Sequence, residues 1–481
     1  MALRGRIPDN EATFPDPVFG VNLHNSPEDL NRGESPLMQN AILEAGLQTR
    51  LGSDRLTAAQ LAASFRVAGG HKFYAQSGVG FRLIAYDTKI ALVADAGTQT
   101  LLSSSQTSDK DTYFTTWSIL DKVYIANGVD ELAEYNGTTF QVVSAIGGSS
   151  QVPGDAGFDA PVQVLPILDR LMVITANGLE RTDARVAHIW SFDSSWATLR
   201  PSLSGPFVGG VTHSLVGTDG TVQGGLLVMQ NNAYYWVTGT DFGLDVTAAS
   251  PTATENAVIR LIDSAVGAIG PRSIATVPGV GVFWLTSDLD IYHVPVGQAT
   301  GVKIGLRIRS TGTTNGLNNM NISRTNRAFL VYHGRYLRVG FPVGSDAFPT
   351  IQYWLDIDKF RLDPRLPVWY GPMTGQSHSA TWTENQGAEN QLIAAEGNQA
   401  TGVFVYTLDV GNTYKDAVGS ANNNVAFEYH TYYKTFGAPS REKLIAEIEF
   451  ELNAYTGDAT VSLADLSGTV SSDIPIEKVR L

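Results

Sequence analysis

Two pairs of aspartates have a spacing that would allow them to act together in catalysis or metal binding. Asp288 and Asp290 are two residues apart, and so are Asp356 and Asp358. Alternate residues of a β-strand point to the same face, so each pair could present two carboxylates together. A glycoside hydrolase or a calcium site requires such an arrangement. The alternative, which we favour, is that both pairs are solvated residues beside a turn.

The other polar residues form no recognisable catalytic, cofactor-binding or metal-binding motif. The eight histidines are scattered, and no two have the i, i+4 spacing of a helical metal site. The string at 191–196, SFDSSW, lacks the glycine and threonine of the repeated sialidase box. No Gly-x-Ser-x-Gly elbow or phosphate-binding loop occurs. We therefore predict no catalytic residue, no metal and no cofactor, and expect the aromatic runs at 234–236 and 353–354 mainly to fill space between sheets.

A hairpin pattern recurs at least seven times along the chain. In each copy an apolar run is followed by a short polar turn and a second alternating run. The two clearest copies are SILDKVYIANGVDELAEY and PILDRLMVITANGLERTD. Weaker copies have their turns at 87–88, 231–232, 287–288, 333–334 and 397–398. The repeat of about 50 residues matches a four-stranded propeller blade. The sequence thus predicts an all-β fold, a β-propeller of about seven blades, with six to eight allowed.

Composition supports a folded protein that does not grip nucleic acid. Hydrophobic residues make up 43% of the 481 residues and charged residues 17%, and there are 48 glycines, a turn-rich β composition. The net charge of −14 and the lack of dense Lys or Arg runs disfavour specific phosphate binding, although an acidic wall would let a duplex slide past. Without cysteine, disulfides and thiol nucleophiles are excluded. No window approaches the length of a membrane-spanning helix.

Three regions are predicted along the chain. Residues 1–60 form an N-terminal arm ending in a hairpin around Gly46, residues 61–424 the propeller, and residues 425–481 a small antiparallel β module. Two short helices are also expected, at 57–65 and at 255–264.

Three sets of residues, in this order along the chain, carry a resemblance to a known family. The first, in the arm, comprises Gly20, Asn22, Gly33, Glu34, Ser35, Pro36, Asn40, Arg50 and Gly52. The second comprises Gly270, Pro271, Arg272 and Ser273, and the third Thr435, Phe436, Gly437 and Lys443. Together they resemble phage tail nozzle proteins, also called tail tubular protein B or tail hub proteins, which are β-propellers of short-tailed phages. Asp290 departs from the pattern, since glycine is common at that position.

The resemblance implies a mechanical function in the virion tail, after assembly in the host cytoplasm. About six copies would form a ring below the portal and adaptor proteins, line and close the DNA exit channel, and anchor fibres or spikes, with no enzymatic activity. It also predicts that deleting residues 1–50 or 425–481 leaves the propeller folded but blocks incorporation into particles. The alternatives are a carbohydrate-binding or carbohydrate-active propeller, which would act in receptor binding, and a cellular interaction scaffold.

Overall fold

The computed structural model describes most of the chain between residues 16 and 475. The described ranges are 16–26, 29–44, 46–57, 60–61, 66–149, 152–155, 158–167, 170–182, 190–191, 205–216, 222–238, 258–310, 315–386, 389–397, 403–410, 415–418, 421–430, 460–464 and 470–475. The chain divides into two compact units, one of residues 13–433 and one of residues 1–12 with 434–481. No helix within the described ranges is long and apolar enough to cross a membrane.

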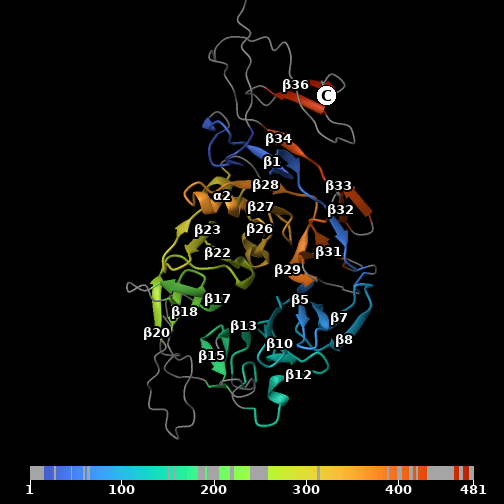
Figure 1. Ribbon diagram of the computed structural model, residues 1–481, viewed down its shortest axis with the longest axis vertical. Helices are drawn as coiled ribbons and strands as arrows, with labels where there is room; N and C mark the ends of the chain where they lie inside the picture. The colour runs from blue at the N-terminus through green and yellow to red at the C-terminus, as the bar shows by residue number, and fades with distance from the viewer. Residues whose placement is uncertain are drawn as a thin grey trace, which may run out of the picture. The chain divides into compact units, whose positions relative to one another are not determined.

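The larger unit is a seven-bladed β-propeller, as predicted, and each blade is a four-stranded antiparallel sheet (Figure 1). Blade 1 consists of β5 (Val67–Tyr74), β6 (Gly80–Tyr86), β7 (Lys89–Val93) and β8 (Gln99–Ser103). Blade 2 consists of β9 (Tyr113–Trp117), β10 (Lys122–Ala126), β11 (Ala133–Tyr135) and β12 (Phe140–Val142). Blade 3 consists of β13 (Pro161–Ile167), β14 (Arg170–Thr175), β15 (Leu179–Thr182) and β16 (Trp190–Ser191). Blade 4 consists of β17 (Phe207–Val216), β18 (Val222–Gln230), β19 (Tyr234–Thr238) and β20 (Val258–Asp263).

The remaining blades are also four-stranded sheets, and the fourth strand of blade 7 comes from the N-terminal arm. Blade 5 consists of β21 (Ile274–Val277), β22 (Gly281–Leu285), β23 (Ile291–Pro295) and β24 (Val302–Lys303). Blade 6 consists of β25 (Phe329–His333), β26 (Tyr336–Phe341), β27 (Ile351–Asp356) and β28 (Trp369–Met373). Blade 7 consists of β29 (His378–Gln386), β30 (Glu389–Glu396), β31 (Val405–Leu408) and β4 (Ser53–Arg55). Since β4 pairs with β31, the N-terminal region completes the ring.

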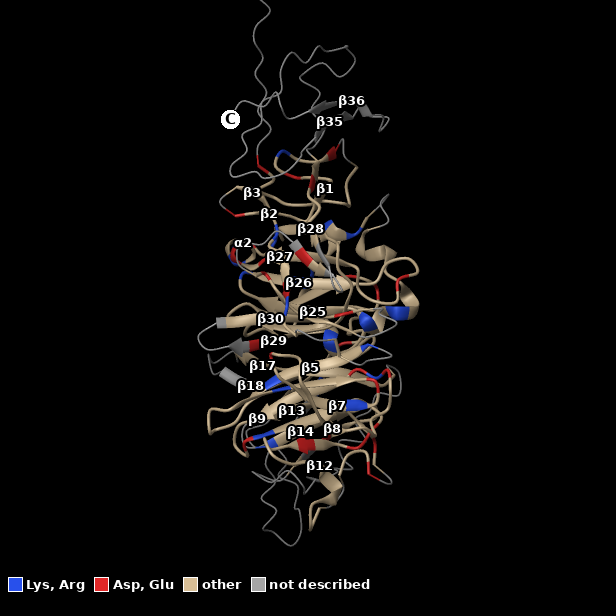
Figure 2. Cartoon of the chain, turned by 90° about the vertical axis from the view of Figure 1, so that its right-hand side faces the viewer, with Lys and Arg blue, Asp and Glu red and all other residues tan. Residues whose placement is uncertain are grey.

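The first strands of the blades form the inner wall of the ring. Each first strand lies against the first strand of the next blade, and the series closes where β29 contacts β5. All seven first strands therefore surround one central axis and begin at the same end of it. Acidic and basic residues are interspersed over the blades in the view of Figure 2.

The predicted turns place the hairpin repeat within the blades. Six of the seven turns connect the second and third strands of a blade, for example at 87–88 between β6 and β7. The exception is the turn at 333–334, which connects the first two strands of blade 6. The aromatic runs pack as expected: Tyr234 and Trp236 share a core with Trp284 of the next blade.

Of the two predicted helices, the one at 255–264 is wrong, and the one at 57–65 lies mostly outside the described residues. Residues 258–263 form β20 instead of a helix, because pairing with β19 provides an outer-strand position that local propensity does not reveal. Most of 57–65 lies outside the described residues, but Leu61 forms an antiparallel bridge with Val403. A short helix that was not predicted, α2 (Ile357–Leu362), follows blade 6's third strand. Single-turn 3-10 helices are η2 (Val143–Ala145), η3 (Pro271–Ser273), η4 (Leu306–Ile308) and η5 (Leu317–Asn319), and η6 (Ile322–Arg327) is longer.

The arm is built into the propeller core. Its predicted hairpin is present as β2 (Ala41–Leu43) and β3 (Leu47–Thr49), and β1 (Leu37–Gln39) pairs with β34 (Glu428–His430). Six buried apolar residues of the arm share one core with blades 5 and 6: Val21, Leu23, Met38, Ala41, Ile42 and Leu43.

Two further hairpins lie outside the blades and the arm. They are β32 (Lys415–Val418) with β33 (Ala421–Asn424), and β35 (Thr460–Ala464) with β36 (Val470–Pro475).

Candidate functional site at the arm junction and the propeller axis

The first aspartate pair stabilises a turn in blade 5. Asp290 is buried, and its Oδ1 accepts hydrogen bonds from the backbone N–H groups of Ile291 and Gly305, both at 2.8 Å. Burial raises the pKa of Asp290 above its usual range. Asp288 is half exposed and forms an ion pair with Lys303. One carboxylate is thus occupied by backbone donors, and the other by a surface cation.

The second aspartate pair begins helix α2. The Oδ1 atom of Asp356 accepts a hydrogen bond from the N–H of Lys359 at 3.1 Å, which caps the helix. Arg335 Nε donates to the same oxygen at 2.9 Å. Asp358 is mostly exposed. Among the described residues, no group of three or more His, Cys, Asp or Glu could hold a metal ion.

The arm motif, in contrast, consists of residues that fix the arm on the propeller. Gly20 has a φ of +70° and forms a bridge with Trp369 in β28. The N–H of Val21 donates to the carbonyl oxygen of Trp369 at 2.8 Å, and the N–H of Ser35 donates to that of Gly20 at 2.9 Å. A Cβ atom added at Gly20 would lie 2.2 Å from the Trp369 oxygen. Only glycine fits this contact.

We therefore expect Gly20→Ala to lower the free energy of unfolding by about 2–4 kcal/mol, through left-handed strain and overlap with backbone. Gly78 is the matched control, because its φ is +82° and nothing lies within 4 Å of the added Cβ. Gly78→Ala should show only the backbone strain, about 1–2 kcal/mol. Equal losses for the two variants in chemical denaturation would show that the Trp369 contact is not tight.

Polar residues of the arm motif fold the arm on itself and join it to blade 5. Asn22 Oδ1 accepts from the N–H groups of His24 and Asn25. The buried Glu34 accepts from the N–H of Asn31 at 2.9 Å and forms an ion pair with Arg307 at 3.0 Å. Further contacts come from the rest of the motif. Gly33, with φ +88°, accepts from the N–H of Phe19; Ser35 Oγ lies 2.6 Å from the carbonyl oxygen of His430; Pro36 precedes β1.

Arg50 and Asn40 are buried at the junction between the arm and blades 6 and 7. Arg50 is 6% exposed and forms a two-pronged ion pair with Asp416, with Nη1 to Oδ1 at 2.9 Å. Its Nη2 donates to the carbonyl oxygen of Thr374 at 2.8 Å, and its Nε donates to Asn40 Oδ1 at 2.9 Å. The carbonyl oxygen of Gly52, the last arm residue of the motif, accepts from the N–H of Val410. These contacts tie the arm to blades 6 and 7 and to β32.

Replacing Arg50 by leucine should cost about 3–5 kcal/mol of unfolding free energy, because the Asp416 carboxylate would remain buried without its cation. Arg365 is the control, since its side chain is 94% exposed and an exposed ion pair contributes little. Urea denaturation of Arg50→Leu and Arg365→Leu measures both. A loss below about 1 kcal/mol for Arg50→Leu would contradict the role of the pair.

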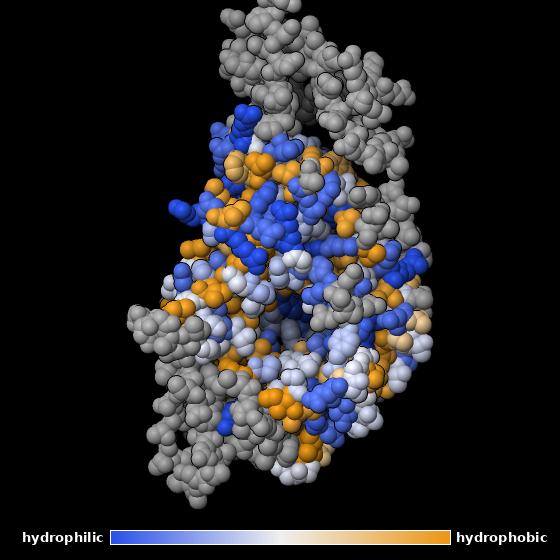
Figure 3. Space-filling view, viewed as in Figure 1, coloured by the Kyte–Doolittle hydropathy of each residue, from blue (hydrophilic) through white to orange (hydrophobic). Residues whose placement is uncertain are grey.

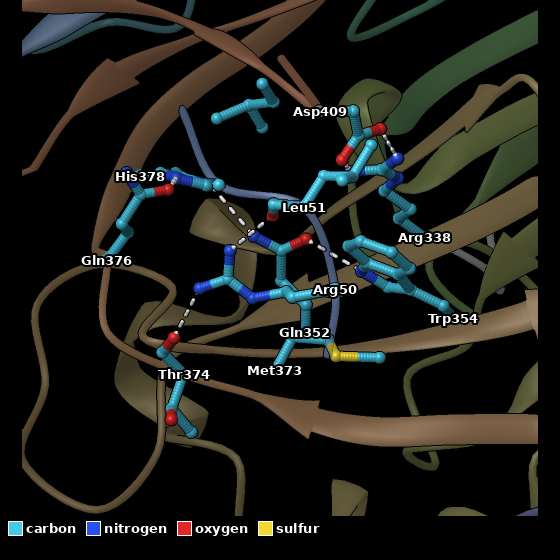
Figure 4. A pocket seen from close by; sticks show the side chains of 12 residues that line it. Arg50, Leu51, Arg338, Gln352, Trp354, Met373, Thr374, Gln376, His378 and Asp409 are labelled. Carbon is cyan, nitrogen blue, oxygen red and sulfur yellow. Dashed lines mark hydrogen bonds and ion pairs between the residues drawn. The ribbon is translucent and has the colours of Figure 1, made fainter. Parts of the chain in front are cut away.

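A small polar cavity lies beside Arg50, between blades 6 and 7 (Figure 4). Arg338 stacks on Trp354, with its Cζ atom 3.8 Å from the ring centroid, and forms an ion pair with Asp409. Figure 4 shows Gln352 reaching toward the buried His378, whose Nδ1 accepts from Gln352 Nε2 at 2.9 Å. The cavity volume of about 20 Å³ holds roughly one water molecule and is too small for a sugar.

The motif of blade 5 leads to the propeller axis. Pro271, Arg272 and Ser273 form η3 after Gly270, and the buried Ser273 donates from Oγ to the Gly270 carbonyl oxygen at 2.6 Å. Arg272 Nη1 donates to the carbonyl oxygen of Ser379 in blade 7 at 2.7 Å, and Nη2 to that of Ala68 in blade 1. One side chain thus spans the axis from blade 5 to blades 7 and 1.

Arg272 belongs to a group that we call the axial charge cluster: Arg66, Asp109, Asp111, Arg272 and Arg327. Each member lies just before the first strand of its blade. Arg66 pairs with Asp111 at 2.6 Å and Asp109 at 2.9 Å, and Arg327 Nη2 donates to Asp109 at 2.8 Å. Burial lowers the pKa of Arg66 from its ordinary value. The cluster crosses the axis at the end where the first strands begin.

Sequence reasoning identified Arg272 but missed the other four members of the cluster. The available signal was their position in the sequence, because all of them lie just before the first strand of a blade.

Figure 3 shows a hollow lined with hydrophilic residues at the centre of the blades. The third set of family-like residues, Thr435, Phe436, Gly437 and Lys443, lies outside the described residues.

No protein-family model and no curated protein matches this chain. Among solved structures, BBS1N in complex with ARL6DN is 11% identical, with a TM-score of 0.43, covering 76% of this chain and 99% of that one. A streptogramin B lyase is 11% identical, with a TM-score of 0.42 and coverage of 75% and 98%. The computationally designed Ika8 protein is 11% identical, with a TM-score of 0.36 and coverage of 74% and 99%. Similarities this distant do not indicate a function.

Proposed function

We propose that the chain is a structural subunit of a viral tail nozzle, which forms a ring below the portal and adaptor proteins. One observation carries the proposal. The arm residues that give the resemblance, above all Gly20, Asn40 and Arg50, are the residues whose backbone or side chains seat the arm on blades 6 and 7. The residues that carry the resemblance therefore form the junction between the arm and the propeller. They are not scattered over the surface.

Side chains that cross the propeller axis determine whether DNA could pass through one subunit. Because Arg272 bridges blade 5 to blades 7 and 1, a duplex has no path through a single subunit. The conduit would lie between the subunits of the ring, lined by their outer faces. A net charge of −14 per chain would discourage phosphate from binding there.

Quantitative mass spectrometry of purified, nuclease-treated particles tests this proposal. The expected result is about six copies per particle, measured against the portal protein. Absence of the chain from particles would overturn the proposal.

The carbohydrate-binding alternative makes a different prediction. A receptor-binding propeller should give a saccharide-specific signal on a glycan array, whereas a nozzle subunit should give none. The array therefore separates the two functions even if the chain is found in particles.

A further inference from the structure

The axial charge cluster contains more positive than negative charge. Three arginines face two aspartates, Asp109 and Asp111, which leaves one excess positive charge among the described residues. The side chains of Arg66, Arg327 and Arg272 are 1%, 5% and 12% exposed. A buried guanidinium without a matching anion is costly, because the protein interior screens charge poorly.

Several hydrogen-bond donors in this region have no acceptor. Arg327 uses only Nη2 to bind Asp109, while its Nε and Nη1 are buried and form no hydrogen bond. The hydroxyl of Ser377, just before the first strand of blade 7, is also buried without a partner. The Phe348 ring centroid lies 5.7 Å from Arg327 Cζ, and Phe348 and Ser377 both lie beside Gly397.

The remaining acceptor of the cluster does not satisfy these donors. Asp111 Oδ1 lies 3.9 Å from Arg327 Nη1 and 3.5 Å from Arg272 Nη1, distances too long for hydrogen bonds of ordinary strength. The same oxygen lies 2.6 Å from Arg66 Nη1. Arg327 is therefore in the field of this carboxylate but is not bound to it.

From the excess charge and the unpartnered donors together, we propose that the propeller axis binds one small inorganic anion beside Arg327. Arg327 Nε and Nη1 donate hydrogen bonds to the anion, and Arg66 and Arg272 add positive potential. A cation is disfavoured by the net charge, and water would leave that charge unmatched.

Thermal unfolding of the whole chain in titrations of sodium phosphate and of sodium chloride tests the site, with sodium gluconate keeping ionic strength constant. The wild type should show a saturable rise in Tm with at least one of the two anions, and the comparison identifies which one binds. Arg327→Gln should raise the half-saturating concentration about tenfold or more. Arg365→Gln, which removes an exposed guanidinium, should behave as the wild type.

Two results would overturn the proposal. The first is the lack of any saturable rise in the wild type, which would leave only water at Arg327. The second is an equal response in Arg327→Gln and the wild type, which would place the anion elsewhere. If Arg327→Gln does not fold, Arg327→Lys replaces it. This variant keeps the charge but loses donors, so a weakened response supports the site, and an unchanged response contradicts it.

Discussion

Removal of residues 1–50 is expected to unfold blades 5 and 6 and to lower the stability of the propeller by on the order of 10 kcal/mol. The six buried apolar residues of the arm belong to the same core as those blades, and fully burying one large apolar side chain contributes about 1.5–3 kcal/mol. Such a loss is comparable to the total stability of a typical domain, about 5–15 kcal/mol. The deletion also removes the Arg50 partner of the buried Asp416.

This outcome replaces the expectation from sequence, in which the propeller survives loss of the arm. Circular dichroism and denaturant unfolding of the 1–50 deletion test it. Deletion of 434–481 is the control, because that segment belongs to the other compact unit and its loss should leave the unfolding of the propeller unchanged. A cooperative transition of near wild-type midpoint in the 1–50 deletion would show that the arm is not part of the core.

Acid should destabilise the propeller through three histidines: His293 and His378 are buried, and His71 is partly buried. Burial lowers the pKa of His71 and of His293 to about 4, and that of His378 to about 3. His378 illustrates the cause, because its Nδ1 accepts from Gln352 while Nε2 donates to Gln376, an arrangement that requires the neutral ring. A second proton has no acceptor there.

The sign follows from the two states. Well above pH 6.5 these histidines are neutral in both the folded and the unfolded chain and contribute no pH dependence. As the pH falls below 6.5, the unfolded chain takes up protons that the folded chain refuses, so stability decreases. The loss continues to about pH 4 for His71 and His293 and to about pH 3 for His378. Each histidine contributes about 1.4 kcal/mol per pH unit within its window. Where all three windows overlap, the slope is about 4 kcal/mol per pH unit.

Urea denaturation between neutral pH and pH 4 measures this slope. His378→Gln should reduce it by about 1.4 kcal/mol per pH unit. If His378→Gln retains the full wild-type slope, His378 is not the buried neutral group described above.

The blades could be predicted because each one repeats the same local pattern. Six turns fell between second and third strands, since a short polar turn between two apolar runs is a local signal. Blade 6 differs because residues 342–350 separate its second and third strands, and the clear short turn at 333–334 belongs to the preceding hairpin. The strand at 258–263 was mistaken for a helix because its partner, β19, lies beyond a long connection.

The site was less predictable because its contacts join residues far apart in the sequence. Arg50 stood out as part of a motif, but its partner Asp416 is 366 residues away. The axial charge cluster combines residues from different blades, such as Arg66 and Arg327, and no single repeat reveals which of them meet at the axis. Asp290 and Asp356 looked suited to chemistry, but backbone donors and a helix N-terminus occupy them.

The most direct test of the proposed function is a reconstruction of the tail by electron cryomicroscopy of intact particles. The nozzle assignment predicts a ring of seven-bladed propellers below the portal, with closed propeller axes and a DNA channel between subunits. Propeller density confined to the tip of a fibre, or absent from the tail, would contradict it.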